Sequence, residues 1–302
     1  MESLNIQKIL VPVDFSEASL NALQTAVAMS KRHQAALVLV HIINPDSVLV
    51  FQEGGLIFDI GTDDYINRMS QKLEHLAEQT QSDTEQPCTG LVQSGATVES
   101  IVKTAEEEGV DIIVMGAHEV SGLREFLIGT TAYSILKHAH CPVLTVPAEG
   151  RWIDFTKIIF PVRPVISALN KYCFSRTIIQ KNRAELIIMG VLEYFGKHAV
   201  TPLEEETNQL VNLVRRDGIR LKRDFYYCSS IAQTILEKAR VFQADLLIVT
   251  ANLEVQLKDF FTGSFARQIV NHAALPVLLI RPSLSLSTPK TAASETFSVL
   301  ER

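Results

Sequence analysis

Short apolar runs alternate along the chain with longer stretches whose apolar residues recur at helical spacing. Lys8–Val13 and Ala36–Ile43 are nearly continuous runs of apolar and β-branched residues, whereas residues 18–32 place their leucines and valines on one helical face. Unbroken apolar strands separated by amphipathic helices are typical of a parallel sheet covered on both faces. The pattern therefore predicts a doubly wound α/β fold.

The same alternation continues to the end of the second half of the chain. In the first half, further helices are expected near 63–80, 97–108 and 130–139, and strands near 89–93, 111–115 and 142–146. In the second half, strands are expected near 157–162, 184–191, 220–227, 245–249 and 276–281.

The chain also repeats itself. Lys8–Val13 (KILVPV) returns as Lys157–Val162 (KIIFPV), an offset of 157 − 8 = 149, and Val110–Val114 returns as Ala244–Ile248, an offset of 244 − 110 = 134. The second copy is thus shorter by 149 − 134 = 15 residues, lost between its first and fourth strands. Two tandem doubly wound parallel-sheet domains are predicted. Their boundaries are residues 1–147 and 157–282, with a linker over 148–156 and a Ser- and Thr-rich tail over 283–302, expected to be disordered.

Candidate chemistry follows the first strand. Ligands of such sheets bind beyond the carboxyl ends of the strands, where the strand order reverses. The first strand runs into Pro12-Val13-Asp14-Phe15-Ser16, and the Asp14 carboxylate can accept a hydrogen bond from a ribose hydroxyl or a base amine. In the alternative interpretation, Asp14 or Ser16 caps the helix that follows.

A glycine-containing segment follows the fourth strand. Met115 leads into Gly116, and Gly129-Thr130-Thr131 precede the next helix. Glycine lets the backbone approach a ligand closely, and amides at a helix N-terminus favour a phosphate. The spacing alone is weak, because many glycines merely turn the chain.

Together these residues resemble the universal stress protein family, a branch of the Rossmann-like, adenine-nucleotide α-hydrolase-like fold group. The nucleotide-binding members carry Gly-x2-Gly-x9-Gly-Ser/Thr, and the first unit reads Gly116-x2-Glu119-x9-Gly129-Thr130 before a helix and HAHCPVLTVP. The resemblance covers residues 5–147 and 157–282 as two copies. It implies that ATP, ADP or AMP binds the first unit, with Mg²⁺ as an optional companion. The implied contacts are Pro12, Val13, Asp14 and Ile42 for adenine and ribose, Met115 beside the base or sugar, and Gly116, His118, Gly129, Thr130 and Thr131 for the phosphates.

Glu119 departs from the family motif. It puts a negative charge where a glycine normally faces the phosphates. Like charges a few ångströms apart repel by roughly 1–4 kcal/mol at effective dielectrics of about 80 to 20. This repulsion weakens ATP binding unless Mg²⁺ bridges the charges or Glu119 points to solvent.

The second unit departs further from the motif. Arg163 stands in the place of the aspartate, and Thr250-x2-Leu253-x9-Gly263-Ser264 keeps only the final glycine and serine. One interpretation is a unit kept for packing and not for binding. The other is that Arg163, with Gly263 and Ser264, holds a different anion.

Composition excludes several classes of protein. Twenty-eight basic and 34 acidic side chains give a net charge of −6, which argues against nucleic acid as a partner. No run approaches the roughly 18 apolar residues of a membrane span, and the four cysteines form no CxxC pair, so a cytoplasmic protein is expected. His138 and His140 flank a helix end and point apart, so a structural role is favoured over a metal site.

These observations predict a stress-response protein that binds an adenine nucleotide in its first unit and acts as a regulatory or signalling module. A nucleotide-independent scaffold with two degenerate pockets is the alternative, and a phosphoryl- or nucleotidyl-transfer enzyme a third. No dedicated catalytic constellation is evident, so at most slow ATP hydrolysis is expected. The resemblance implies that the last strands, Val143–Val146 and Val277–Ile280, pair the two units within one chain, and homodimerisation is left open.

Overall fold

The structure is a computed structural model that describes residues 4–44, 62–117, 130–163, 168–193, 200–250 and 265–281. In the N-terminal half the strands are β1 (Lys8–Pro12), β2 (Ala36–Ile43), β3 (Cys88–Ser94), β4 (Ile112–Ala117) and β5 (Val143–Pro147). The helices of this half are α1 (Glu17–His33), α2 (Thr62–Thr84), α3 (Thr97–Glu107) and α4 (Thr130–His138).

The C-terminal half repeats this order of elements. Its strands are β6 (Lys157–Val162), β7 (Glu185–Glu193), β8 (Arg220–Cys228), β9 (Leu246–Thr250) and β10 (Val277–Ile280). Its helices are α5 (Ala168–Lys181), α6 (Val200–Arg216), α7 (Ile231–Phe242) and α8 (Phe265–His272). The expected strands and helices are therefore confirmed, with ends that shift by a few residues. The expected tail over 283–302 lies outside the described residues.

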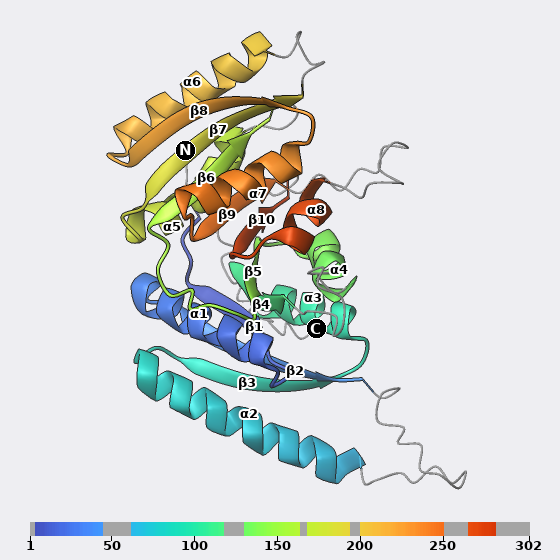
Figure 1. Ribbon diagram of the computed structural model, residues 1–302. Helices are drawn as coiled ribbons and strands as arrows, with labels where there is room; N and C mark the ends of the chain where they lie inside the picture. The colour runs from blue at the N-terminus through green and yellow to red at the C-terminus, as the bar shows by residue number, and fades with distance from the viewer. Residues whose placement is uncertain are drawn as a thin grey trace, which may run out of the picture.

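All ten strands join one sheet, in the order β3-β2-β1-β4-β5-β10-β9-β6-β7-β8 (Figure 1). Neighbouring strands run parallel except β5 and β10, which pair antiparallel with Leu278 opposite Leu144. The predicted pairing of the last strands within the chain is thus present. It fuses two parallel α/β halves into a single mixed sheet.

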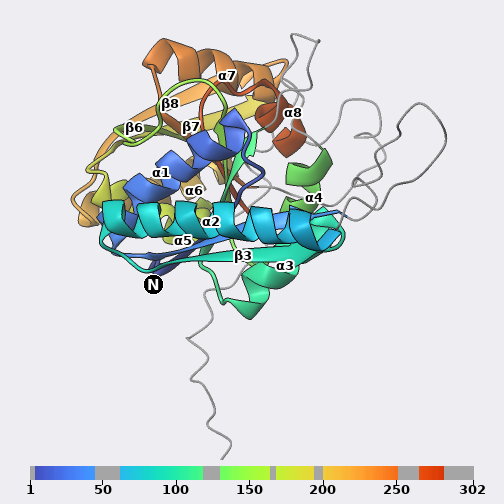
Figure 2. The same cartoon turned by 90° about the horizontal axis from the view of Figure 1, so that it is seen from below.

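Helices cover both faces of this sheet. One buried cluster joins alternate strand residues such as Ile9 and Val11 to α1, α2, α5 and α6, and the other joins Leu10 and Ile113 to α3, α4, α7 and α8. Figure 2 shows α2 and α3 on opposite sides of β3. Strands buried on both faces need apolar side chains at successive positions, which explains their unbroken apolar runs.

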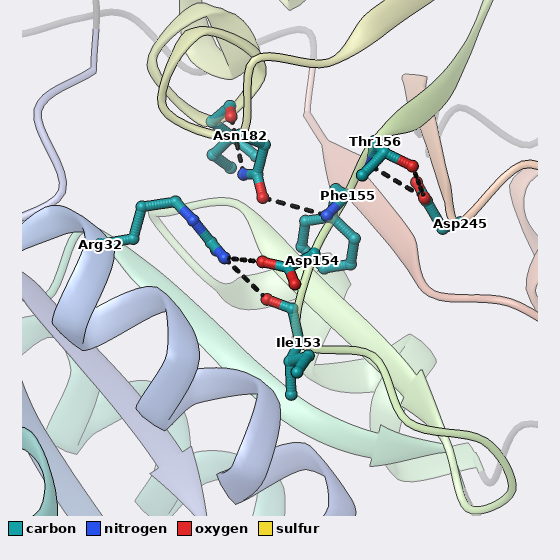
Figure 3. A network of polar contacts seen from close by, with 8 residues as sticks. Arg32, Ile153, Asp154, Phe155, Thr156, Asn182 and Asp245 are labelled. Atoms are coloured by element: carbon teal, nitrogen blue, oxygen red, sulfur yellow. Dashed lines mark hydrogen bonds and ion pairs between the residues drawn. The ribbon is translucent and has the colours of Figure 1, made fainter.

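The segment between β5 and β6 is fastened to both halves (Figure 3). Arg32, near the end of α1, donates to the Ile153 carbonyl oxygen at 2.9 Å and pairs with Asp154. On the other side, the Phe155 N–H donates to Asn182 Oδ1 at 3.0 Å. The benzyl group of Phe155 is fully buried. The segment therefore adds a buried aromatic side chain to the core and is hydrogen-bonded to both halves.

The repeated aspartates have a structural role in both halves. Asp111 Oδ2 accepts from the backbone N–H groups of Gln7 and Lys8, at 2.7 and 2.9 Å. Asp245 likewise accepts from the N–H groups of Thr156 and Lys157, at 2.8 and 3.0 Å. Each carboxylate ties the start of one strand to the start of its neighbour.

Within the described residues, no helix is both long and apolar enough to cross a membrane.

Candidate functional site

The carboxyl ends of β2, β1 and β4 lie side by side in the N-terminal half. Strand β1 pairs with β2 on one side and with β4 on the other. Strands β2 and β3 lie on one side of β1, and strands β4 and β5 lie on the other, so the strand order reverses at β1 (Figure 1). Such a switch point is where doubly wound sheets bind ligands. The topology brings Asp14, Ile42 and Gly116 to the same edge of the sheet.

Asp14 lies in an exposed turn directly after β1. Its Oδ1 accepts from the Ser16 N–H at 3.0 Å and from the Ser16 hydroxyl at 2.6 Å. Ser16 in turn caps α1, because its Oγ accepts from the Ser19 N–H at 3.2 Å. The capping interpretation therefore holds for Ser16, while Asp14 orients the cap and carries a carboxylate at the surface.

The backbone of Val13 is already engaged. Its N–H donates to the Val40 carbonyl oxygen at 2.8 Å, and His41 Nδ1 lies 2.7 Å from the Val13 carbonyl oxygen. The isopropyl group of Val13 is buried in the core cluster that also contains side chains of α1 and α2. A ligand would therefore meet Val13 through the second lone pair of its carbonyl oxygen.

Three aromatic and cationic side chains beside Asp14 were missed from the sequence. Phe15 has a φ of 63°, in the left-handed region, and its ring centroid is 5.3 Å from that of His41. Lys72 of α2 places its Nζ 3.8 Å from the Phe15 centroid. His41 interrupts an otherwise apolar strand, which is a signal that could have singled it out. Lys72 gives no such signal, since it lies on an amphipathic helix.

Gly116 has a packing reason to be glycine. A Cβ built at this position would stand 2.6 Å from the Ala18 carbonyl carbon and 2.7 Å from its oxygen. Strand β4 thus passes directly against the first turn of α1. Met115 and Ile42 pack on the other face of the sheet, Met115 buried and Ile42 half-buried.

The predicted phosphate side is described only in part. Helix α4 begins at Thr130, as expected, and Thr131 is half-buried in its first turn. The amides of a helix N-terminus carry partial positive charge that favours an anion. His118, Gly129 and the unusual Glu119 lie outside the described residues.

In the described parts of the chain, the histidine and cysteine side chains do not come together as the ligands of a metal ion. His138 Nδ1 lies 2.8 Å from the Ser134 carbonyl oxygen, and no group of three His, Cys, Asp or Glu side chains there is placed to hold a metal ion. All four cysteines are free and buried, and burial raises the pKa values of Cys88 and Cys141 to about 12. Thiols with such pKa values are poor nucleophiles.

Comparisons with known proteins agree with this geometry. The family model of the universal stress protein family matches residues 5–147 and 202–281. Universal stress protein MJ0577 of Methanocaldococcus jannaschii is 29% identical over 160 residues, which span 49% of this chain and 99% of the relative. Universal stress protein YxiE of Bacillus subtilis is 30% identical over 145 residues, 46% of this chain and 97% of the relative.

A solved structure matches both halves together. The crystal structure of a universal stress protein from Archaeoglobus fulgidus superposes with a TM-score of 0.71 at 19% identity, covering 91% of this chain and 98% of that one. At this identity the likeness shows the fold alone. The family model matches well over half of the sequence, in both halves of the sheet. The chain therefore belongs to the universal stress protein family.

Proposed function

We propose that the N-terminal half binds an adenine nucleotide, ATP, ADP or AMP, and that the chain acts as a regulatory or signalling module in a stress response. The observation that carries this proposal is the meeting of Asp14, Ile42 and Gly116 at one switch point of the sheet. Membership of the universal stress protein family supports it.

The residues present fit the nucleoside part of such a ligand. Ribose hydroxyls are donors, and Asp14 offers a carboxylate at the surface, held in place by Ser16. Ile42 supplies apolar surface at the carboxyl end of β2 for a base. The phosphates would face the N-terminus of α4. A bound Mg²⁺ would offset the repulsion between the phosphates and the Glu119 carboxylate.

Gly116 favours a second candidate function. Because Ala18 requires glycine at this position for packing, the glycine is retained whether or not a phosphate binds nearby. A nucleotide-independent scaffold would therefore keep the same residue. Asp14 separates the two candidates, because replacing its carboxylate changes nucleotide affinity only if a nucleotide contacts it.

The test is a calorimetric titration of the full chain with Mg-ATP, ADP and AMP, comparing wild type with Asp14→Asn. Asparagine keeps an oxygen that can accept from Ser16 but replaces the second acceptor with a donor. We expect affinity to fall roughly tenfold or more, since a hydrogen bond to a charged group is worth about 1.5–3 kcal/mol.

Glu17→Gln is the matched control. Glu17 is an exposed acid three residues along, in the first turn of α1, and its replacement removes the same charge. We expect its affinity to stay within about twofold of wild type. No saturable binding of any nucleotide would favour the scaffold. Saturable binding with equal affinities for Asp14→Asn and wild type would contradict the proposed contact at Asp14.

A further inference from the structure

Strand β8 forms one end of the ten-stranded sheet. It pairs with β7 along its whole length, from Arg220 opposite Glu185 to Cys228 opposite Glu193, and no described strand lies on its other side. Figure 1 shows β8 at the edge of the C-terminal half. The backbone groups of β8 that point away from β7 are therefore open to a further strand.

The two faces of this edge strand differ in chemistry. Arg220 and Lys222 lie on the face of the sheet that α7 covers, and both are exposed. Leu221 and Phe225 lie on the face that α6 covers, where they are half-buried against the core. Because side chains alternate along a strand, a strand that adds here meets cations on one face and apolar side chains on the other.

Positive charge is concentrated at the start of β8. Residues 215–223 (RRDGIRLKR) contain five cationic side chains and one acidic side chain, in a chain whose net charge is −6. Arg215 and Arg216, in the last turn of α6, are as exposed to solvent as the cations of β8. The acid, Asp217, is already paired with Arg176 of α5. The five cations therefore have no acidic partner within their own segment.

Two acidic side chains lie near these cations. Glu185 of β7 pairs with Lys222 at 3.5 Å, but the Lys222 side chain stays 58% exposed. Asp224 of β8 accepts from the Tyr226 hydroxyl at 3.4 Å. The five cations outnumber these two acids, so the edge attracts an acidic strand and repels a basic one.

The equivalent strand of the N-terminal half lacks these cations. When the halves are aligned through the offset of 149 and the strand registers, Thr89 and Gly90 of β3 stand where β8 has Lys222 and Arg223. Strand β3 carries no charged side chain. The fold therefore does not require cations on this strand. On β8 they repel a second copy of β8 and attract a strand of opposite charge.

We propose that β8 binds an extended segment of a partner protein in which acidic and apolar residues alternate, and that this segment adds to the sheet as a further strand. Main-chain hydrogen bonds to β8 hold the segment in place. Its carboxylates lie beside Arg220 and Lys222, and its apolar side chains lie beside Leu221 and Phe225. The interaction is independent of nucleotide binding in the N-terminal half.

The test is fluorescence anisotropy of a labelled nine-residue peptide, as long as β8, in which glutamate alternates with valine. Titrated with the full chain at low ionic strength, the peptide should bind saturably below about 1 mM. The matched peptide with glutamine in place of glutamate should bind roughly tenfold more weakly. Raising the salt concentration from about 20 mM to about 200 mM should weaken binding of the glutamate peptide several-fold.

Two methylated peptides test the main-chain pairing. Successive N–H groups of a strand point to opposite sides, so N-methylation of alternate residues removes the donors along one side only. One peptide is methylated on its glutamates and the other on its valines. The form whose methyl groups face β8 should lose binding, and the other should keep it. Equal affinities of the two forms would contradict strand addition.

Substitutions on the protein test the charges. The double variant Arg220→Gln, Lys222→Gln should weaken peptide binding roughly tenfold. Asp224→Asn removes an acid from the same face and should tighten binding several-fold, a gain that cannot come from a misfolded variant. Lys103→Gln is the matched control, because Lys103 is an exposed lysine of α3 that pairs with Glu107 at 3.6 Å. Its affinity should stay within about twofold of wild type.

Four further results would overturn the proposal. The first is no saturable binding of the glutamate peptide up to about 1 mM. The second is equal binding of the glutamine peptide, and the third is an affinity that Arg220→Gln, Lys222→Gln leaves unchanged. The fourth is preferential binding of a single-stranded oligonucleotide at this edge, which would assign β8 to nucleic acid.

Discussion

Gly116 and Ala18 are in such close contact that the space for a Cβ on Gly116 is already filled by the backbone of Ala18. Gly116→Ala should therefore destabilise the fold by about 1–3 kcal/mol, the usual cost of overpacking a core. Because the nearest atoms are the Ala18 carbonyl carbon and oxygen, adding Ala18→Gly should not rescue it. Denaturant unfolding of the single and double variants measures this.

Gly90→Ala is the matched control for this prediction. A Cβ on Gly90 would stand 3.2 Å from Leu73 Cγ and 3.3 Å from the Leu73 carbonyl oxygen, a tight contact but well short of the overlap at Gly116. We expect a smaller loss than for Gly116→Ala. Full recovery of stability in the Gly116→Ala, Ala18→Gly double variant would contradict the backbone clash.

His33 should make the protein sensitive to acid. It is buried at the end of α1, and neither ring nitrogen has a hydrogen-bond partner. Burial, with the charges of Lys181 and Arg32, lowers the pKa of His33 to about 4. The unfolded chain takes up this proton near pH 6.5, so stability is present above that pH and is lost as the pH falls toward 4.

His33→Leu should remove that loss. Between about pH 7 and about pH 4.5 the variant should gain about 2 kcal/mol relative to wild type, at about 1.4 kcal/mol per pH unit. Carboxylates titrate in both proteins, so only the difference is informative. Parallel unfolding free energies at the two pH values would show that His33 is not the group responsible.

Lys171 should also make the stability rise with pH, but over a higher pH range than His33. Its pKa of about 7 lies below that of an unfolded lysine, near 10.4, so the unfolded chain holds more protons between those values. Burial of Lys171 therefore costs the most stability below pH 7, and the cost shrinks as the pH rises. Lys171→Met should be more stable than wild type near pH 6, and this advantage should shrink by about 2 kcal/mol near pH 9. A constant difference in unfolding free energy would contradict a shifted pKa.

The chain should be a monomer of 33.6 kDa in solution. β5 and β10 each have a neighbour on both sides, so neither is an open edge to which a second copy could add. The end strands of the sheet are β3 and β8, and β8 carries several charged side chains, which disfavour edge-to-edge pairing. Light scattering measures the mass directly, and a mass near twice this value would require another interface.

Much of this fold could be read from the sequence. Ala36–Ile43 is a buried strand because its apolar side chains face helices on both sides, and that pattern is local. The offset of 149 predicted the second half, and the structure keeps that offset in its registers. Asp14 was placed at the ligand-binding end of the sheet because it follows the carboxyl end of the first strand, whereas Ile42 came only from the resemblance to the universal stress protein family.

Contacts between distant segments could not be read in this way. The stacking of Lys72 on Phe15 and the contact of Gly116 with Ala18 depend on how helices settle on the sheet. Lys171 resembles a surface lysine in the sequence. The offset of 149 makes it the equivalent of Ala22 in the first half, which is buried in the structure as Lys171 is. Sequence patterns give the face of an element, whereas these contacts depend on how two elements pack.

The most direct measurement of the central claim is mass spectrometry of the small molecules released from freshly purified wild type and Asp14→Asn. A nucleotide bound at the switch point of the N-terminal half should co-purify with wild type and be depleted in the variant. We predict an adenine nucleotide near one per chain from wild type and a much smaller amount from Asp14→Asn. Wild type that releases no adenine nucleotide, and gains none after incubation with millimolar Mg-ATP, would contradict the account.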